Sequence, residues 1–343
     1  MRLLVKGASV MLVAAVLGAA AGLAQPTIPQ SQVPRDAPAA VRAQIEQLYA
    51  DDAEIRSSAC FKLRDMKVEG APAVPFLIAL LADDATVSVV RGDMGSQGTV
   101  GEVAGWALVG IGRSATEPLI AAVQDPAFPA RDRAALCLGA LRDRRGLEPL
   151  LAAAKDANPK LRAAVVSRLN YYYDPRAKRA LFAATSDPDP GVRKAVMEAL
   201  WSGQDPRAVP ALVAGLEDEN AEVRAAAAFC LSSQSDQAKV EPLLAALKDE
   251  DSKVREYAAG ALRGTKDPRA VPVLVAALHD VRETVVREAV QSLCRPGARE
   301  AVSSLLELLA EDDPYLESKV AQSLGAIGDR RATIPLLAAL AAL

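Results

Sequence analysis

One helical unit recurs along the chain at a fixed interval of 31 residues. Leu200 and Leu231 are 31 residues apart, and leucines continue on the same grid from Leu138 to Leu324. An acidic turn residue and the basic residue six positions later follow the same interval, as Asp125 and Arg131, Asp156 and Arg162, Asp187 and Arg193, Asp218 and Arg224, and Asp249 and Arg255. Several series with one common period are typical of a solenoid of stacked supersecondary units.

The apolar spacing inside each unit is helical. Val223, Ala227 and Leu231 fall on one face of a helix. Pro242 suits the first turn of the next helix, where its missing N–H costs nothing. We therefore predict an all-α fold, a right-handed α-solenoid of about nine helix pairs followed by a terminal helix. The core of such a fold is a thin layer between helices, which agrees with an aromatic content of only 4%.

The first residues have the features of an export signal. Arg2 and Lys6 precede an apolar run that ends in small residues, so residues 1–24 are predicted to be a secretory signal peptide cleaved after Ala24. The predicted location is therefore periplasmic or secreted, with no membrane span after cleavage. The alternative is that the segment is retained as a membrane anchor.

Two further segments interrupt the repeat pattern. Residues 25–37 are rich in Pro and Gln and are predicted to be a solvated linker before the solenoid, which spans 38–343. Leu77 and Leu119 are 42 residues apart instead of 31, so an insertion of 11 residues lies within 88–99. We expect this glycine-containing insertion to be a flexible surface loop.

Charge and cysteine content narrow the range of functions. The formal net charge is −3, and both signs are interspersed along the repeats, which argues against a surface for nucleic acid or anionic lipid. Cys137 and Cys230 occupy the same repeat position three units apart. Stacked helices lie about 8–10 Å apart, so these two residues are too distant for a disulfide. The four cysteines are predicted to be unpaired apolar core residues.

The sequence contains no pattern typical of catalysis. His279 is the single histidine, and no cysteines have metal-binding spacing. The recurring turn acids are expected to cap helices and to pair with the arginine six residues on. We predict no catalytic residue, no cofactor and no metal site, and therefore a protein that is not an enzyme.

The repeat resembles a known family. The D-x5-R turn, the helix ending in Ala-Leu, the Gly328–Ala332 connection (GDRRA) and the Pro-Leu-Leu helix start resemble the short HEAT-like repeats of the phycobilisome-lyase type, over residues 38–343. The resemblance implies an armadillo-type α-solenoid in which the repeated Asp and Arg form a hydrogen-bonded ladder. The family includes scaffolds, bilin lyases and a di-iron deoxyhypusine hydroxylase. The His-Glu pairs of the hydroxylase are absent here. A lyase-like or hydroxylase-like enzyme and a purely structural spacer remain the alternatives to a binding scaffold.

A group of aromatic residues marks the predicted binding surface. Trp201 and Phe229 lie in adjacent repeats, and three tyrosines end a helix one repeat earlier. On the arginine-bearing helices, positions one, five and eight after the arginine point away from the apolar stripe. We predict that this concave second-helix surface binds a protein or peptide, through Tyr171, Tyr172, Tyr173, Trp201, Phe229, Leu136, Glu198 and Arg263. The alternative is that these rings pack over the edge of a neighbouring repeat. The apolar terminal helix, residues 331–343, is predicted to associate with a second copy.

Overall fold

The computed structural model describes residues 26–91, 94–201, 205, 207–234, 237–309 and 313–342. The predicted signal peptide therefore lies outside the described residues. The chain divides into two compact units, Met1–Ala184 and Thr185–Leu343. Within the described ranges, no helix is both long and apolar enough to cross a membrane.

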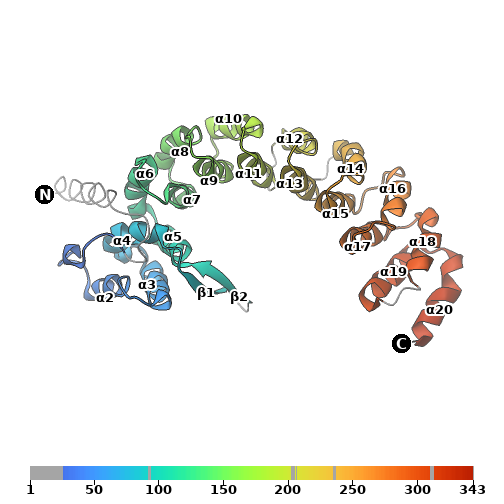
Figure 1. Ribbon diagram of the computed structural model, residues 1–343, viewed down its shortest axis with the longest axis horizontal. Coiled ribbons are helices and arrows are strands. Elements are labelled where there is room, and N and C mark those ends of the chain that lie inside the picture. The colour runs from blue at the N-terminus through green and yellow to red at the C-terminus, as the bar shows by residue number, and fades with distance from the viewer. Residues whose placement is uncertain are drawn as a thin grey trace. The chain divides into compact units, whose positions relative to one another are not determined.

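Unit 1 consists of two rows of helices and one hairpin (Figure 1). The helices α3, α5, α7 and α9 pack side by side in one row, and α4, α6, α8 and α10 form the other. The element bounds are α2 Ala39–Gln47, α3 Ala53–Asp65, α4 Val74–Ala79, β1 Thr86–Arg91, β2 Met94–Thr99, α5 Val100–Ile111, α6 Thr116–Gln124, α7 Arg131–Leu141, α8 Leu147–Ala153, α9 Pro159–Leu169 and α10 Pro175–Ala183.

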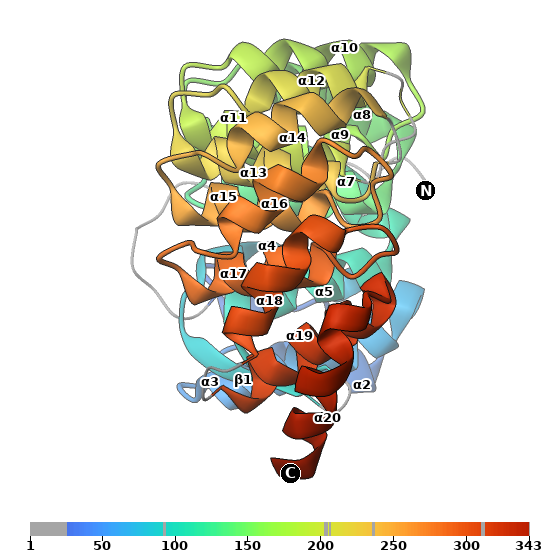
Figure 2. The same ribbon diagram turned by 90° about the vertical axis from the view of Figure 1, so that its right-hand side faces the viewer.

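Unit 2 repeats the same arrangement. The helices α11, α13, α15, α17 and α19 pack in sequence along one row, and Figure 2 shows α12, α14 and α16 as a second layer over them. The bounds are α11 Pro190–Leu200, α12 Ala208–Gly215, α13 Ala221–Leu231, α14 Val240–Ala246, α15 Ser252–Ala261, α16 Ala270–Ala277, α17 Glu283–Ser292, α18 Val302–Leu308, α19 Pro314–Ile327 and α20 Thr333–Ala342. The grid leucines Leu200, Leu231 and Leu262 are buried between these layers, which confirms the predicted α-solenoid.

Helix starts follow from the turn sequence. The side chain of Asn220 accepts hydrogen bonds from the N–H groups of Glu222 and Val223, and so caps α13. Inside α13, Ala227 and Ala228 are fully buried. Because alanine adds so little volume, the backbones of neighbouring helices can approach closely here. A polar turn therefore starts α13, and small residues set its spacing to the neighbouring helices.

Each ladder arginine connects two consecutive repeats. Arg193 donates from Nη1 to the carbonyl of Asp187 at 2.8 Å, and from Nε and Nη2 to both carboxylate oxygens of Asp218 at 2.7 and 2.9 Å. The expectation that each Asp carboxylate pairs with the arginine six residues on is wrong, because Arg193, Arg224 and Arg255 bind the backbone carbonyl of that Asp instead. The carboxylate is bound by the arginine of the preceding repeat. The ladder implied by the family resemblance is thus present in this form.

Four further arginines bind an aspartate of the following repeat. The remaining pairs are Arg224 with Asp249, Arg255 with Asp280, Arg131 with Asp156, and the fully buried Arg56 with Asp83. Arg162 donates to the carbonyl of Asp156 at 2.9 Å, and Asp125 accepts from the N–H of Ala127 at 2.9 Å. Arg56 and Asp83 are 27 residues apart instead of 25, and neither is among the predicted ladder residues.

The segment predicted to be a solvated linker is partly folded. Ile28 is buried, its carbonyl accepts a hydrogen bond from the Tyr49 hydroxyl, and Gln30–Gln32 forms a short 3-10 helix. The prediction for residues 25–37 is therefore wrong at this point. Its basis was composition, and a proline-rich composition does not prevent one apolar side chain from reaching the core.

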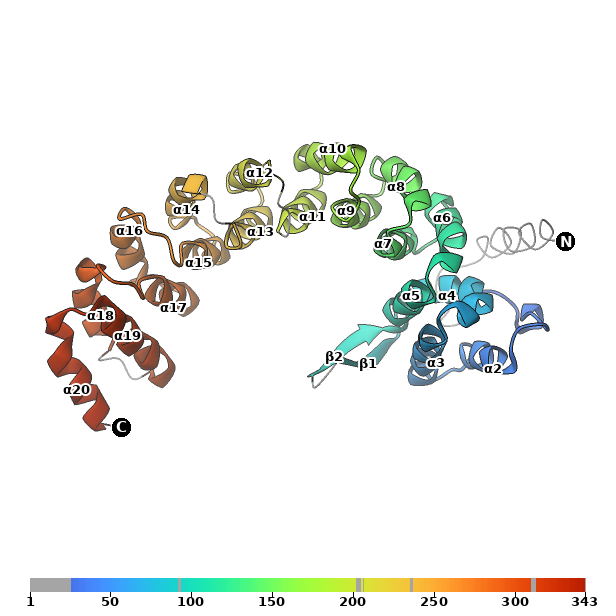
Figure 3. The ribbon, with the colours of Figure 1, turned by 180° about the vertical axis from the view of Figure 1, so that it is seen from behind.

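The insertion is a β-hairpin rather than a flexible loop. Strands β1 and β2 pair antiparallel (Figure 3). In this register Val87 is opposite Gly98 and Val89 is opposite Ser96. Val87 and Val89 are buried, and the N–H of Ser88 donates to Glu54 of α3 at 2.8 Å. The alternation of polar residues and valines from Thr86 to Val89 was the available strand signal.

Candidate functional site

Three aromatic side chains form a line across consecutive repeats of unit 2. Trp201 directly follows α11, Phe229 lies in α13 and Tyr257 in α15. The rings of Trp201 and Phe229 stack with centroids 6.3 Å apart, and Tyr257 meets Phe229 edge-on at 5.3 Å. The exposed fractions of Trp201 and Phe229 are 50% and 48%. Half of each large apolar side chain therefore faces solvent.

These rings border a hollow of about 660 Å³, which we call the aromatic groove. Ala221, Ala225 and Ala226 of α13 also line it. Alanine methyl groups leave room that larger side chains would fill, so the depth of the groove follows directly from the composition of α13. The surrounding charged residues are Lys194, Glu198, Glu222, Asp251 and Lys253.

The charged residues of the aromatic groove differ in their pairing. Lys194 Nζ lies 2.8 Å from Glu222 Oε2, and this hydrogen bond raises the pKa of Lys194. Glu198 lies one helical turn before Trp201 on α11. Its carboxylate forms no hydrogen bond or ion pair with a described residue, but its charge contributes to the raised pKa of Lys194. The groove therefore combines apolar rings with charges of both signs, and neither Glu198 nor Lys253 forms an ion pair with a described residue.

The sequence predicted Trp201, Phe229 and Glu198 together but missed Tyr257. Tyr257 is two positions after Arg255, where the preceding repeats have Ala226 and Ala195. Positions one, five and eight after the arginine are the ones that point away from the apolar stripe. Helix packing also brings Tyr257, at position two, against Phe229. A tyrosine where other repeats have alanine was the signal available.

The three consecutive tyrosines belong to unit 1 and have different surroundings. Tyr172 is only 5% exposed, its hydroxyl donates to the carbonyl of Leu138 at 3.5 Å, and burial raises its pKa to about 12. The prediction that Tyr172 contacts a partner is therefore wrong. Tyr173 is fully exposed, and Tyr171 lies against the guanidinium groups of Arg142 and Arg168, at 4.7 and 6.0 Å. Consecutive residues at a helix end point in different directions, so residues that are adjacent in sequence need not share a surface.

Two more predicted contact residues lie outside the aromatic groove. Arg263 forms an ion pair with Glu288 at 2.7 Å and does not line the groove. Leu136 is in unit 1, where it lines a different hollow. These two residues therefore do not join the Trp201–Phe229 line.

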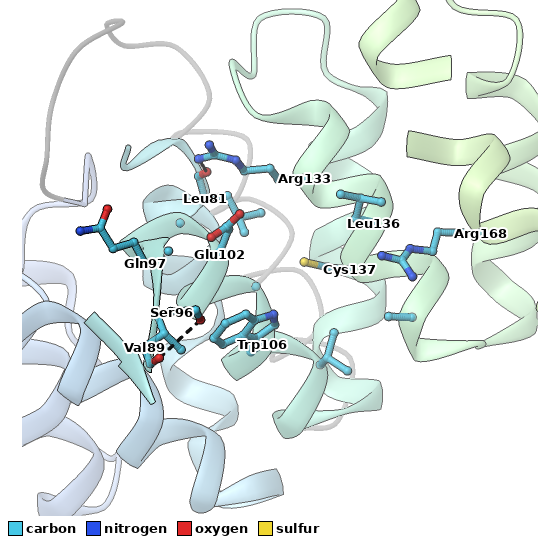
Figure 4. A pocket seen from close by; sticks show the side chains of 15 residues that line it. Leu81, Val89, Ser96, Gln97, Glu102, Trp106, Arg133, Leu136, Cys137 and Arg168 are labelled. Atoms are coloured by element: carbon cyan, nitrogen blue, oxygen red, sulfur yellow. Dashed lines mark hydrogen bonds between the residues drawn. The ribbon is translucent and has the colours of Figure 1, made fainter. Parts of the chain in front are cut away.

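This second hollow, the hairpin pocket, has a volume of about 340 Å³ and lies between β2, α5 and α7 (Figure 4). Its apolar lining includes Val89, Trp106 and Leu136, and the guanidinium of Arg168 points toward it from α9. Cys137 also lines it, and burial raises the pKa of that thiol to about 12. At neutral pH the thiol is therefore protonated and a poor nucleophile.

The described residues contain no group of three or more His, Cys, Asp or Glu side chains placed to hold a metal ion. His279, the single histidine, is exposed on unit 2.

Comparison with known proteins agrees with the architecture. A family model described as HEAT repeats matches residues 147–221, 209–294 and 282–342, and a model described as PBS lyase HEAT-like repeat matches residues 130–156. The crystal structure of the Escherichia coli protein YibA is similar, with 21% identity and a TM-score of 0.55, covering 66% of this chain and 86% of YibA. A crystallised engineered protein matches at 20% identity and a TM-score of 0.45, covering 84% of this chain and 89% of that protein. No curated protein matches the sequence significantly. The chain belongs to the HEAT-repeat family.

Proposed function

We propose that this HEAT-repeat chain is an exported, non-enzymatic scaffold that binds a protein partner through the aromatic groove. The observation that carries the proposal is the line of Trp201, Phe229 and Tyr257, in which Trp201 and Phe229 are half-exposed. Tryptophan and tyrosine are enriched among residues that dominate binding energy at protein interfaces. Their rings bury much area at a low cost in side-chain entropy.

The charges around the rings define the partner further. Glu198 lies one helical turn before Trp201 and forms no ion pair with a described residue, so a basic side chain of the partner gains an ion pair there. The same cation can stack on the exposed face of an aromatic ring. The segment that fits is therefore an apolar stretch with a flanking lysine or arginine.

Export is part of the same proposal and rests on the sequence of residues 1–24. Fractionation of cells, followed by N-terminal sequencing of the protein, tests it. A mature chain beginning at Gln25 in the exported fraction is expected. An intact amino terminus in the cytoplasm would refute it.

The partner proposal is tested by affinity capture from the exported fraction. Wild type is compared with the double variant Trp201→Ala/Phe229→Ala, and Tyr173→Ala is the matched control because this exposed ring lies outside the groove. We expect a protein retained by wild type and by the control to be lost from the double variant. Recovery unchanged by the double variant would remove the groove as the binding site, and the absence of any partner would favour a structural spacer.

Fluorescence provides a direct reading of the same site. The chain has two tryptophans, Trp106 in the hairpin pocket and Trp201 in the aromatic groove. In a Trp106→Phe variant, the emission comes from Trp201 alone. We expect the captured partner to shift this emission to shorter wavelength, because binding removes the ring from water. An unchanged spectrum at saturating partner would argue against contact with Trp201.

A further inference from the structure

Strand β2 of the two-stranded hairpin has an outer edge with no neighbouring strand among the described residues. Backbone groups of successive strand residues alternate between the two edges of an antiparallel strand. The N–H of Ser88 donates to Glu54, and that of Thr99 to Glu102, so both point away from the ladder between β1 and β2. Gln97 lies opposite Ser88 and two residues before Thr99. The N–H and C=O of Gln97 therefore point to the outer edge of β2.

Each outer edge of the hairpin is bound at one N–H by a glutamate, and on β2 this N–H is that of Thr99, which donates to Glu102 at 2.9 Å. The edge of β1 faces α3, where Glu54 binds the N–H of Ser88 at 2.8 Å. At the edge of β2, no described residue binds the backbone of Gln97, and its side chain is exposed. An unpaired strand edge is a template for another extended chain.

The open edge of β2 forms one wall of the hairpin pocket. Gln97 lines this pocket together with Trp106 of α5 and Leu136 of α7. Gly105 also lines it, and the sulfur of Cys137 packs closely against this glycine. Side chains of an added strand alternate between its two faces. A residue of that strand can therefore place an apolar side chain over Trp106 and Leu136 while its main chain pairs with Gln97.

The opposite wall of the pocket carries an unpaired positive charge. Arg168 has a buried Nε without a hydrogen-bond partner, and its guanidinium points toward the pocket (Figure 4). No carboxylate of the described residues forms an ion pair with Arg168. The guanidinium carbon of Arg168 lies 6.0 Å from the ring centroid of Tyr171. Arg133, the other arginine of the lining, already binds Asp84 and the carbonyl of Leu81. The positive charge of Arg168 therefore has no carboxylate partner among the described residues.

We propose that β2 accepts an extended segment of a protein partner as a third strand, with an apolar side chain over Trp106 and Leu136 and an acidic side chain at Arg168. This site lies wholly in unit 1 and shares no residue with the aromatic groove. A failure of the proposed role of Trp201 would therefore leave this proposal unaffected.

The test begins with a library of short linear peptides displayed on phage and selected against the full chain. Gln97→Pro removes the outward N–H of β2, whereas Gln97→Ala changes the side chain and keeps that donor. Proline is tolerated where an edge N–H faces solvent, and circular dichroism verifies that both variants fold. We expect selected peptides to bind Gln97→Ala like wild type and Gln97→Pro at least about tenfold more weakly. A selection without binders, or binders that Gln97→Pro retains fully, would overturn the proposal.

The acidic contact has its own matched comparison. In a Trp201→Phe background, Trp106 is the single tryptophan and reports on the pocket. A selected peptide and its Glu→Gln form are titrated against wild-type Arg168 and against Arg168→Gln. We expect the charged peptide to lose at least about fivefold in affinity on Arg168→Gln and the neutral peptide to change little. Equal effects of Arg168→Gln on both peptides would refute the assigned role of Arg168.

Discussion

Arg224 and Asp249 form a two-point ion pair across consecutive repeats. Nε of Arg224 lies 2.8 Å from one carboxylate oxygen and Nη2 lies 3.0 Å from the other, while Nη1 donates to the carbonyl of Asp218 at 2.9 Å. One planar guanidinium thus fixes the turn of its own repeat and the turn of the next. This geometry requires arginine, because the single ammonium group of lysine cannot bind in the same fork.

Loss of this pair is expected to destabilise unit 2. Arg224→Gln leaves the mostly buried carboxylate of Asp249 without its cation, so we expect the free energy of unfolding to fall by about 2–4 kcal/mol. The exposed pair of Arg269 and Glu241 is the control, and Glu241→Gln should cost less than about 1 kcal/mol. Urea denaturation followed by circular dichroism measures both values. Equal effects would show that the ladder contributes no more than a surface ion pair.

The ladder also predicts acid sensitivity. The hydrogen bond from Arg255 holds the pKa of Asp280 below its ordinary value, and the hydrogen bond from Arg131 does the same for Asp156. A carboxyl group whose pKa is lower in the folded state contributes its stability above the unfolded pKa, about 3.9, and loses it as the pH falls through the folded pKa. We therefore expect constant stability from these groups near neutral pH and a loss below about pH 4.

The variant Asp280→Asn isolates this effect for one residue. Its free energy of unfolding should lie below that of wild type at neutral pH, and the difference should shrink as the pH drops below about 4. Denaturation curves of both proteins at several pH values measure the difference. A difference independent of pH would assign the loss to packing instead of charge.

The fold of this chain can be predicted from the sequence far better than the arrangement of its surface residues. The 31-residue interval from Leu200 to Leu231 identifies the solenoid because every repeat must bury the same positions. The ladder partner was misassigned because Asp218 and Arg224 are close in sequence, whereas stacking brings Arg193 closer in space. The rings of the aromatic groove come from separate helices, so only helix packing shows that Tyr257 joins Phe229.

Tyr172 and Tyr173 provide a matched pair for testing burial. Tyr172 is in the core of unit 1, and Tyr173 next to it is fully exposed. We expect Tyr172→Ala to lower the free energy of unfolding by about 3–5 kcal/mol, through lost burial and the cavity it leaves. Tyr173→Ala should change it by less than about 0.5 kcal/mol. Thermal and urea unfolding measure both, and a large effect of Tyr173→Ala would contradict its exposure.

The cysteines should differ in reactivity within the native protein. Cys60, Cys137 and Cys230 are buried, and burial raises the pKa of each thiol to about 12, whereas Cys294 is half-buried. A thiol reagent at neutral pH should therefore modify Cys294 first, and all four cysteines only after denaturation without reductant. Cys294→Ser should abolish the fast reaction. Fewer than four reactive thiols in the denatured protein would reveal a disulfide.

The last helix presents apolar side chains to solvent and should mediate self-association. Ile334 and Leu337 of α20 are 79% and 61% exposed. Burying two such side chains against a second copy is favourable by about 25 cal/mol per Å² of apolar area. We expect association that strengthens with concentration in sedimentation experiments and weakens at least about tenfold in Ile334→Glu/Leu337→Glu. Val281→Glu, which alters an exposed apolar residue elsewhere in unit 2, should leave association unchanged. A monomer at every concentration would contradict this role of α20, because the exposed pair would then have no partner copy to cover it.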